Sequence, residues 1–368
     1  MKIKVAGKFY NYFNAVVIST TLDTIASIFT FTAFYDQDNP DHKILFKPLS
    51  YYKIEFFHDE DTGGGLIMTG TITHHSFKSS KENNLVQISG YSLPGVLDDC
   101  QIPYSLYPLE SDNRTLAQIV ARLITPFHLN VITYPVVTKE ASQLIAKTVA
   151  KVDETIKDYL CKVANQKNVV ISHDIHGNVI LFRPDISAAT KLTLTGQNTL
   201  EMELAIDGTK IHSDITCLRQ PSRSKGENQF EGEEDADQAT NPDAESNGQG
   251  KAFKIESINT VKNPLVQAYR PMVRRLTKLS FYDTNRAALN MRAAELKNIR
   301  VLFALDHWEP ISVGDIIEVL NPEIFINNKA RMVLESTVIQ ESSERKTMTG
   351  VLVLAETFTG DEPQNIFG

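Results

Sequence analysis

The segment Phe29–Tyr35, FTFTAFY, alternates apolar side chains with the threonines at positions 30 and 32. Successive side chains of a β-strand point to opposite faces, so this period of two places one face in a core and the other toward water. A second alternating run, Tyr52–Phe56, is followed by the turn-forming residues Asp59–Gly65 and by further β-rich sequence at Leu66–Phe77. We predict a small antiparallel barrel or sandwich over residues 1–96, with the β-barrel preferred because closure removes exposed strand edges.

Residues 97–188 change from a period of two to helical spacing. Apolar residues within 116–123 recur at i, i+3, i+4 and i+7, which predicts a helix after Asp112 as its N-cap. A second helix is expected to begin near Asp153, with Asp153 or Thr155 as its N-cap, and a β-hairpin is expected after it. This span is therefore predicted to be a small α/β domain.

Strand patterns return from residue 189. Strand candidates lie between Ile299 and Phe358, whereas residues 201–206 fit either a strand or a helix because both periods match. Residues 283–300 predict a basic helix with a narrow apolar stripe of small side chains. We predict a second β-barrel domain over 189–359 and a tail at 360–368. The predicted fold class is mainly β with an α+β insertion, in which two similar antiparallel β-barrel domains flank the small α/β domain.

Charge is segregated within the second predicted barrel domain. Residues 201–250 contain four Lys or Arg and twelve Asp or Glu, a net charge of −8. Residues 251–300 contain eleven Lys or Arg and three Asp or Glu, a net charge of +8. Within the acidic part, residues 222–250 have Phe230 as their only large apolar side chain, which is too little to offset the entropy lost on ordering the backbone. We predict a mobile acidic loop there.

The composition argues against several classes of protein. Hydrophobic residues make up 42% and charged residues 22% of the chain, as in ordinary globular proteins. No apolar run approaches the ~18 residues of a membrane-spanning helix. The first twenty residues lack the apolar stretch and cleavage site of a secretory signal. The net charge of −8 argues against wrapping of nucleic acid, which needs clustered cations.

The sequence motifs predict no catalytic, metal or cofactor site. Three cysteines without a Cys-X-X-Cys pair indicate free, buried thiols in a reducing compartment. His74 and His75 are adjacent on a predicted strand, so their side chains point to opposite faces and cannot share one metal ion. The sequence contains no nucleophile elbow, zinc-binding helix or phosphate-binding loop motif. We expect a protein without enzymatic activity and without a cofactor.

Four segments stand out by their order and spacing. They are GYSLPGVLDDCQIP (Gly90–Pro103), YRPMVRRL (Tyr269–Leu276), RAALNMRAAELKNIR (Arg286–Arg300) followed by a strand ending in Trp308, and the Gly, strand, proline turn and strand pattern of Pro310–Phe358. In this order they resemble the Mu-like baseplate hub family of contractile-tailed phages, which is related to the hub part of type VI secretion spike proteins. The candidate subunit-interface or family-signature residues within them are Asp98, Cys100, Arg270, Arg274, Arg275, Arg286, Trp308 and Gly314.

The resemblance implies a mechanical role. Members of the family form trimeric rings, in which two barrels per chain give six similar units that match a sixfold tail tube to a threefold spike. The implied partners are two further copies of the chain in a homotrimer, a tail tube protein, a central spike protein and other baseplate proteins. DNA is expected to pass through the ring without specific binding. The resemblance places the protein in the tail baseplate of the virion, after assembly in the cytoplasm of the bacterial host.

A β-rich, acidic chain also fits a tail adhesin or carbohydrate-binding protein. Such a protein needs exposed aromatic platforms on which sugars stack. The chain has one tryptophan, Trp308, and we expect it on a buried strand. A cell-wall hydrolase would need a carboxylate pair in a separate lytic domain, and no span of the chain is left for one. The hub interpretation is therefore preferred.

The oppositely charged segments 201–250 and 251–300 are expected to meet across subunits, because a heterologous interface brings different patches together. Replacing Arg274→Glu together with Arg275→Glu should weaken the trimer, seen as a smaller sedimentation coefficient. A trimer that is unchanged at both high and low salt would contradict this pairing.

Overall fold

The computed structural model describes residues 1–10, 13–59, 65–81, 84–219, 257–276, 283–342 and 344–367. They form two compact units, one made of Met1–Ile211 with Ala293–Gly368 and the other of His212–Arg292. The predicted acidic loop at 222–250 lies outside the described residues. The fold is mainly β, with antiparallel sheets and an α+β insertion, as the sequence predicts.

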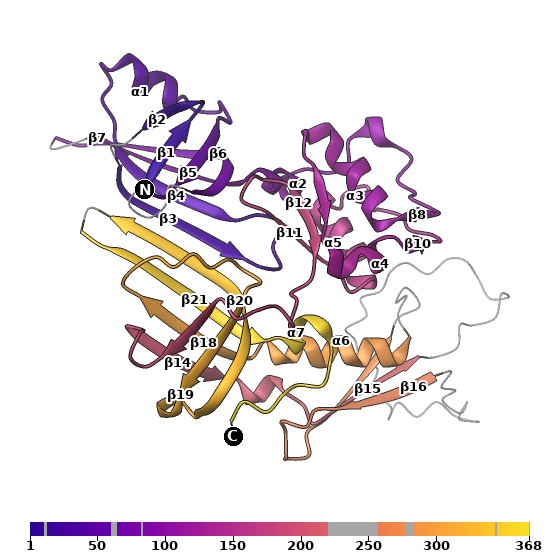
Figure 1. Ribbon diagram of the computed structural model, residues 1–368. Helices are drawn as coiled ribbons and strands as arrows, with labels where there is room; N and C mark the ends of the chain where they lie inside the picture. Colours follow the sequence, from indigo (N-terminus) through magenta and orange to yellow (C-terminus); the bar gives the residue numbers. More distant parts are fainter. Residues whose placement is uncertain are drawn as a thin grey trace, which may run out of the picture. The chain divides into compact units, whose positions relative to one another are not determined.

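Strands β1 to β7 form the N-terminal strand set, which is antiparallel throughout (Figure 1). Their order in the sheet is β3-β4-β7-β6-β5-β1-β2. Val16 of β3, Phe31 of β4 and Ile54 of β5 are buried in the same cluster, so the sheet curls around a shared core. The bounds are β1 (Lys2–Val5), β2 (Lys8–Tyr10), β3 (Phe13–Thr21), β4 (Ile28–Phe34), β5 (Lys53–Phe57), β6 (Leu66–Ser79) and β7 (Asn84–Ser92).

A short helix that the sequence analysis missed, α1 (Pro40–Leu45), lies between β4 and β5. Its N-cap is Asn39, whose side chain accepts a hydrogen bond from the Asp41 N–H at 2.9 Å. Pro40 suits the first helical position because its ring fixes a helical backbone angle there. Leu45 and the following Phe46 are buried in the core of the N-terminal strand set, which explains why this helix forms.

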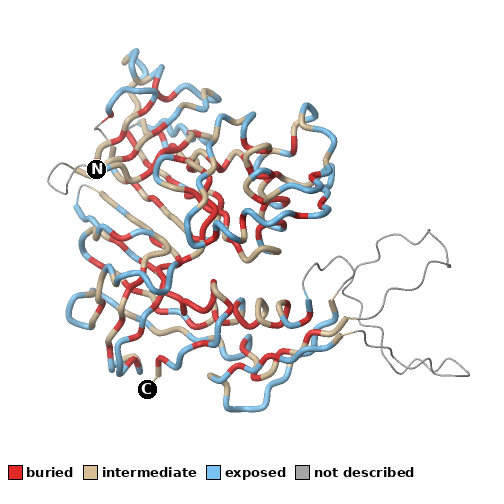
Figure 2. The backbone as a smooth tube through the Cα atoms, turned by 45° about the vertical axis from the view of Figure 1, so that its right-hand side comes forward, coloured by how far each residue is buried: buried red, intermediate tan, exposed pale blue. Residues whose placement is uncertain are grey.

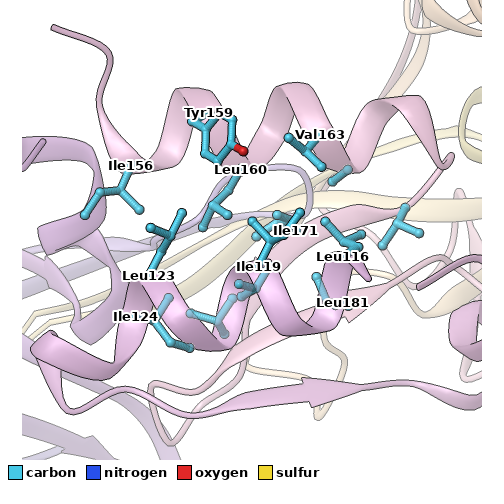
Figure 3. Packing of buried hydrophobic residues seen from close by; sticks show 14 of the residues in the cluster. Leu116, Ile119, Leu123, Ile124, Ile156, Tyr159, Leu160, Val163, Ile171 and Leu181 are labelled. Atoms are coloured by element: carbon cyan, nitrogen blue, oxygen red, sulfur yellow. The ribbon is translucent and has the colours of Figure 1, made fainter. Parts of the chain in front are cut away.

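The middle domain is a small α/β domain, as predicted. Helices α3 and α5 pack on each other and on the sheet β11-β12-β9, and Leu123, Leu160 and Ile171 belong to their common core (Figure 3). The hairpin β11-β12 follows α5, as expected. The bounds are η2 (Leu93–Gly95), α2 (Val96–Asp99), η3 (Tyr104–Leu106), β8 (Arg114–Thr115), α3 (Leu116–Ile124), η4 (Thr125–Phe127), β9 (Val131–Thr133), η5 (Pro135–Val137), α4 (Thr138–Ala141), β10 (Leu144–Ile145), α5 (Ile156–Gln166), β11 (Val170–His173) and β12 (Val179–Phe182).

The caps of these helices differ partly from the prediction. The N-cap of α3 is Thr115, not Asp112, because Thr115 and Gln118 satisfy each other's backbone N–H groups in a capping box. Asp112 instead accepts a hydrogen bond from the Thr148 N–H at 3.2 Å. The N-cap of α5 is Thr155, one of the two predicted candidates.

The C-terminal strand set contains β14-β18-β21-β20, with β19 on β20 and β13 on β19. Figure 2 shows buried residues along the strands of both sets. Residues 201–206 form a strand, which decides between the two predicted alternatives. The helix predicted for 283–300 ends at Leu296, because β18 already begins at Ile299. The bounds are β13 (Leu192–Thr195), β14 (Glu201–Ile206), η6 (Gly208–Lys210), β18 (Ile299–Leu305), β19 (Ile316–Asn321), η7 (Pro322–Ile324), β20 (Ile326–Ser342), β21 (Lys346–Leu354) and α7 (Glu356–Thr359).

The two strand sets repeat one topology. The order β3-β4-β7-β6-β5-β1 in the first set corresponds to β14-β18-β21-β20-β19-β13 in the second, and the corresponding strands also follow each other in the same order along the chain. One pairing differs, since β1 and β5 are antiparallel whereas β13 and β19 are parallel. The two sets are hydrogen-bonded to each other through β3 and β20, so the strands of the two sets form one 13-stranded sheet.

The second compact unit contains the sheet β16-β15-β17 and the first part of α6. The buried cluster of this unit includes Ile215, Cys217 and Ala288, so the small side chains of α6 allow close packing on the sheet, as the apolar stripe predicts. The bounds are β15 (Asp214–Arg219), β16 (Ser257–Lys262), β17 (Pro271–Leu276) and α6 (Thr284–Leu296).

Gly314 is a position where the fold requires glycine. Its φ is +93°, and a Cβ there would lie 2.8 Å from Cζ of Phe182. Its N–H donates a hydrogen bond to the Leu334 carbonyl at 2.8 Å, so the backbone cannot easily move away.

Gly314→Ala should lower the free energy of unfolding by about 2–4 kcal/mol, because the backbone would be strained and the core overpacked. Urea denaturation measures this, and Gly208→Ala, where a Cβ meets nothing within 4 Å, is the matched control. Equal effects of the two variants would contradict the requirement.

Candidate subunit interface

Asp98 and Cys100 fasten helix α2 to helix α5 in the middle domain. Asp98 accepts a hydrogen bond from Nζ of Lys157 at 2.7 Å. The Cys100 carbonyl accepts one from the Ile156 N–H at 3.0 Å, and burial raises the pKa of the Cys100 thiol, with a further contribution from nearby Asp99. Both residues therefore hold the middle domain together.

The four candidate arginines all belong to the second compact unit. Arg274 and Arg275 are exposed neighbours on β17, and Arg286 is half-buried in α6. The Arg270 N–H donates a hydrogen bond to Oγ of Ser213 at 2.8 Å, which fixes the start of β17 beside β15. The structure thus places these arginines together in the second compact unit.

Trp308 lies at the junction of the two strand sets. The prediction that Trp308 ends a buried strand is wrong, because β18 ends at Leu305 and Trp308 is half-buried beyond it. Its ring lies against His58, with the two ring centroids 3.5 Å apart. Burial, together with the nearby ammonium of Met1, lowers the pKa of His58 from 6.5 to about 4, so His58 is neutral at pH 7.

The junction itself is a ladder between β3 and β20. Seven described residue pairs run antiparallel, from Ser336 opposite Thr21 to Ser342 opposite Ala15. Ile339 lies opposite Ile18 and packs against the core of the N-terminal strand set. Strand β20 pairs with two strands along one edge. Its first half pairs with β19 and its second half pairs with β3.

A cluster of charges supports the ladder near the start of the chain. The Met1 ammonium lies 2.7 Å from Asp59 and 2.5 Å from Glu341, and Nζ of Lys346 lies 2.5 Å from Asp59. Burial acts to raise the pKa of Asp59, but hydrogen bonds from Lys346 and the Met1 ammonium outweigh it and lower the pKa. The hydrogen bond to Asp59 raises the pKa of Lys346 against the opposing effect of burial. Both cationic groups thus hold carboxylates of the two strand sets together.

A second ionic contact lies toward the other end of the ladder. Lys297 donates a hydrogen bond to Asp23, which follows β3, and its Nζ lies 3.7 Å from Glu335 of β20. Burial raises the pKa of Glu335, partly offset by Lys297. One lysine of the C-terminal part therefore ties both strands of the junction.

Among the strand edges that no described strand covers are the outer edge of β14 and part of one edge of β6. β14 pairs with β18 on one side, and no described strand pairs with its outer edge. β6 pairs with β7 along Gly70–Ser79, but on its other edge β5 reaches only Thr71, so no described strand covers His74–Ser79 there. An open strand edge presents unpaired backbone groups that can bind another strand. We call these two edges the β14 edge and the β6 edge.

Within the described residues, no cluster of three or more His, Cys, Asp or Glu could hold a metal ion. Among the described helices, none has the length and apolar character needed to cross a membrane.

Comparisons with known proteins agree with this architecture. Residues 94–183, which coincide with the middle domain, match the family model of the baseplate hub protein gp44-like, second domain. The 43 kDa tail protein of prophage MuSo2 from Shewanella oneidensis has a TM-score of 0.75 at 17% identity, over 97% of this chain and 98% of that chain. The predicted resemblance to baseplate hub proteins is confirmed.

The same fold occurs in other tail and secretion proteins. A tail protein from Neisseria meningitidis has a TM-score of 0.72 at 18% identity, covering 98% of both chains. A component of the type VI secretion system of E. coli has a TM-score of 0.55 at 10% identity, over 100% of this chain and 80% of that chain. No curated protein sequence matches the chain. The fold shared with these tail and secretion proteins therefore extends beyond the span of the family model, over nearly the whole chain.

Sequence reasoning missed the open edges and the junction ladder. The feature that marks both long strands is a β-bulge, which is a shift of the pairing register. It lies between Ile72 and His74 in β6 and between Leu334 and Ser336 in β20. Such bulges depend on pairing with distant strands, so one sequence alone does not reveal them.

The lowered pKa of His58 predicts a pH-dependent stability. Between pH 6.5 and about 4 the unfolded chain binds a proton on this residue that the folded chain does not, so the free energy of unfolding should fall as the pH drops through that window. His58→Phe keeps a ring against Trp308 and should reduce the fall, measured by urea denaturation at pH 7 and pH 4.5. His176→Phe, on an exposed turn, is the control. An identical pH dependence in both variants would contradict the assignment.

Proposed function

We propose that this protein is a structural baseplate hub protein of a contractile phage tail, and that three copies form a ring between the sixfold tail tube and the threefold spike. The family match of residues 94–183 and the whole-chain fold shared with prophage tail proteins support this role. The proposed partners are the tail tube protein, the central spike protein and other baseplate proteins in the virion. The proposed role is mechanical and not catalytic.

The observation that carries the proposal is the repeated strand order with its built-in junction. The chain already joins two sets of the same topology edge to edge through β3 and β20. The β14 edge and the β6 edge differ from each other, so a contact between them is heterologous and generates a ring when the rotation closes. Three chains would supply six strand sets to such a ring. This number is the one needed to face a sixfold tube.

A channel that DNA crosses should not bind phosphate. The sheet face opposite the cores carries Thr30 and Thr32 in the N-terminal strand set. In the C-terminal strand set the same face has a hollow of ≈ 230 Å³ lined by residues that include Glu201, Glu203 and Leu302. The charged side chains that line this hollow, Glu201 and Glu203, are acidic and do not attract a polyanion. We therefore propose that this face lines the channel.

A tail adhesin is the second candidate, and one observation favours it. Tyr104 and Tyr107 form a pair of exposed rings in the middle domain, with centroids 5.2 Å apart, and exposed aromatic faces can stack on sugars. Trp308 does not offer such a platform, because His58 covers it. Binding of the protein to bacterial surface glycans, lost in Tyr104→Ala, would favour the adhesin over the hub.

The ring is tested by native mass spectrometry and by electron-microscopy class averages of the purified protein and of the protein co-produced with its tail tube partner. We expect a mass of three chains and a ring with a central hole, and no tight binding of duplex DNA. A stable dimer or tetramer in both preparations, or duplex binding that resists physiological salt, would contradict the proposal.

A further inference from the structure

We propose that the β14 edge of one copy pairs antiparallel with the β6 edge of a second copy, with Leu204 opposite Phe77 and Glu203 opposite Lys78. This inference rests on the proposed ring and adds the strands, their direction and their register. The partner is therefore a second copy of this chain, bound by main-chain hydrogen bonds along two open strand edges.

The chain contains its own template for this contact. Within one chain, β3 of the N-terminal strand set pairs with the second half of β20 in the C-terminal strand set. In the repeated topology, β14 takes the place of β3, and β6 takes the place of β20. The two strands that form the occupied junction thus correspond to the two strands that carry the β14 edge and the β6 edge. Repeating the junction between copies pairs the β14 edge with the β6 edge.

The bulges fix how β6 and β20 correspond, residue by residue. The pairing of β6 with β7 shifts between Ile72 and His74, and the pairing of β20 with β21 shifts between Leu334 and Ser336. His74 therefore corresponds to Ser336. Counting three residues onward along each strand, Phe77 corresponds to Ile339.

The ladders across each sheet fix the other side. Opposite the bulges, Gly90 pairs with Phe29, and Phe29 pairs with Ile18. In the second set, Leu352 pairs with Val301, and Val301 pairs with Leu204. Ile18 therefore corresponds to Leu204. Phe31 and Phe303, two residues further along β4 and β18, are both buried, which supports this correspondence independently.

The register of the pairing between β3 and β20 within one chain then gives the register of the contact between copies. Ile339 lies opposite Ile18 within the chain, so Phe77 of one copy lies opposite Leu204 of the next. The neighbouring positions place Lys78 opposite Glu203, and Ser76 opposite Ala205. These pairs were not used to derive the register, so their chemistry tests it.

The side chains match in this register and in no register shifted by one residue. Phe77 is 44% exposed and Ile206 is 49% exposed, although both lie on the face of their strand that turns toward a core. The proposed pairing covers Phe77 with Leu204 and gives Lys78 an acidic partner on the opposite face. A shift by one residue would place Phe77 opposite Glu203 or Ala205 and move every side chain to the wrong face.

Pairing of two β14 edges with each other fits less well. Glu201 and Glu203 lie on one face of β14, so two such strands side by side would bring carboxylates together. Like charges on facing strands are destabilising. Lys78 on the β6 edge instead complements that face, which favours the head-to-tail contact.

Cysteine cross-linking tests the register directly. Opposite residues of an antiparallel pair lie within disulfide reach, whereas positions two residues away along the strand lie at about 7–8 Å, at or beyond its limit. The chain carrying Ser76→Cys and Ala205→Cys should shift from the monomer band to dimer and trimer bands on non-reducing gels after oxidation. The unmodified chain reports any cross-linking through Cys100, Cys161 or Cys217.

Two control variants make the result specific. Ser19→Cys with Val338→Cys occupies the equivalent pair of the template and should form a disulfide within one chain. Ser76→Cys with Glu203→Cys is displaced by two residues and should stay in the monomer band. Cross-linking of the displaced pair as strong as that of the proposed pair would overturn the register.

The outcomes separate this inference from the proposed function. A trimeric ring in which the proposed pair does not cross-link would overturn the inference and leave the ring intact. A ladder of bands that continues beyond three chains would support the pairing of the two edges but contradict a closed three-chain ring. Bands that stop at three chains would support both.

A charge exchange provides an independent measurement. Lys78→Glu should raise the dissociation constant of the contact by about 5- to 30-fold, because an attractive pair becomes a repulsive one. Combining Lys78→Glu with Glu203→Lys should restore association. Equal weakening by the single and the double variant would overturn the pairing, while far-ultraviolet circular dichroism confirms that each variant is folded.

Discussion

The ladder between β3 and β20 holds the two strand sets together in one sheet. It joins the first strands of the chain to nearly the last, across more than three hundred residues. Charged groups from both ends of the chain support it, since Lys346 and the Met1 ammonium share Asp59 and Glu341. Closing so long a loop costs entropy, so the junction is stable only because a packed core and these ion pairs act with the ladder. The result is a chain that carries its own subunit-like contact.

The middle domain has a different part in the architecture. Its own core, built from α3, α5 and the sheet β11-β12-β9, makes it a domain that the family model recognises by itself. It also contacts the strand sets: His173 accepts a hydrogen bond from the Ser27 N–H at 3.1 Å, and Phe182 packs with Leu22 and Val333. The domain is therefore anchored on both strand sets near their junction, which explains why Gly314, against Phe182, has no room for a side chain.

Local chemistry made part of this fold predictable. The alternation in Phe29–Tyr35 and the helical spacing of residues 116–123 depend on neighbours along the chain, and both are confirmed. Trp308 and the helix at 283–300 were placed less accurately, because where β18 begins and ends depends on its partners β14 and β21. The sequence predicts two similar barrels, but the correspondence of their individual strands was not visible in it. That correspondence lies in strand order and bulge positions, which different side chains of similar polarity can encode. The open edges were missed because edge strands differ from central strands only by what lies beside them.

We propose that the contact between β3 and β20 within one chain recurs between chains. An electron cryomicroscopy map of the assembled ring, at a resolution that separates strands, would show this contact. We expect continuous strand pairing from β14 of one chain to β6 of the next, with the two strand sets of each chain at equal radius. Strand sets at different radii, or a gap in pairing between neighbouring chains, would contradict it.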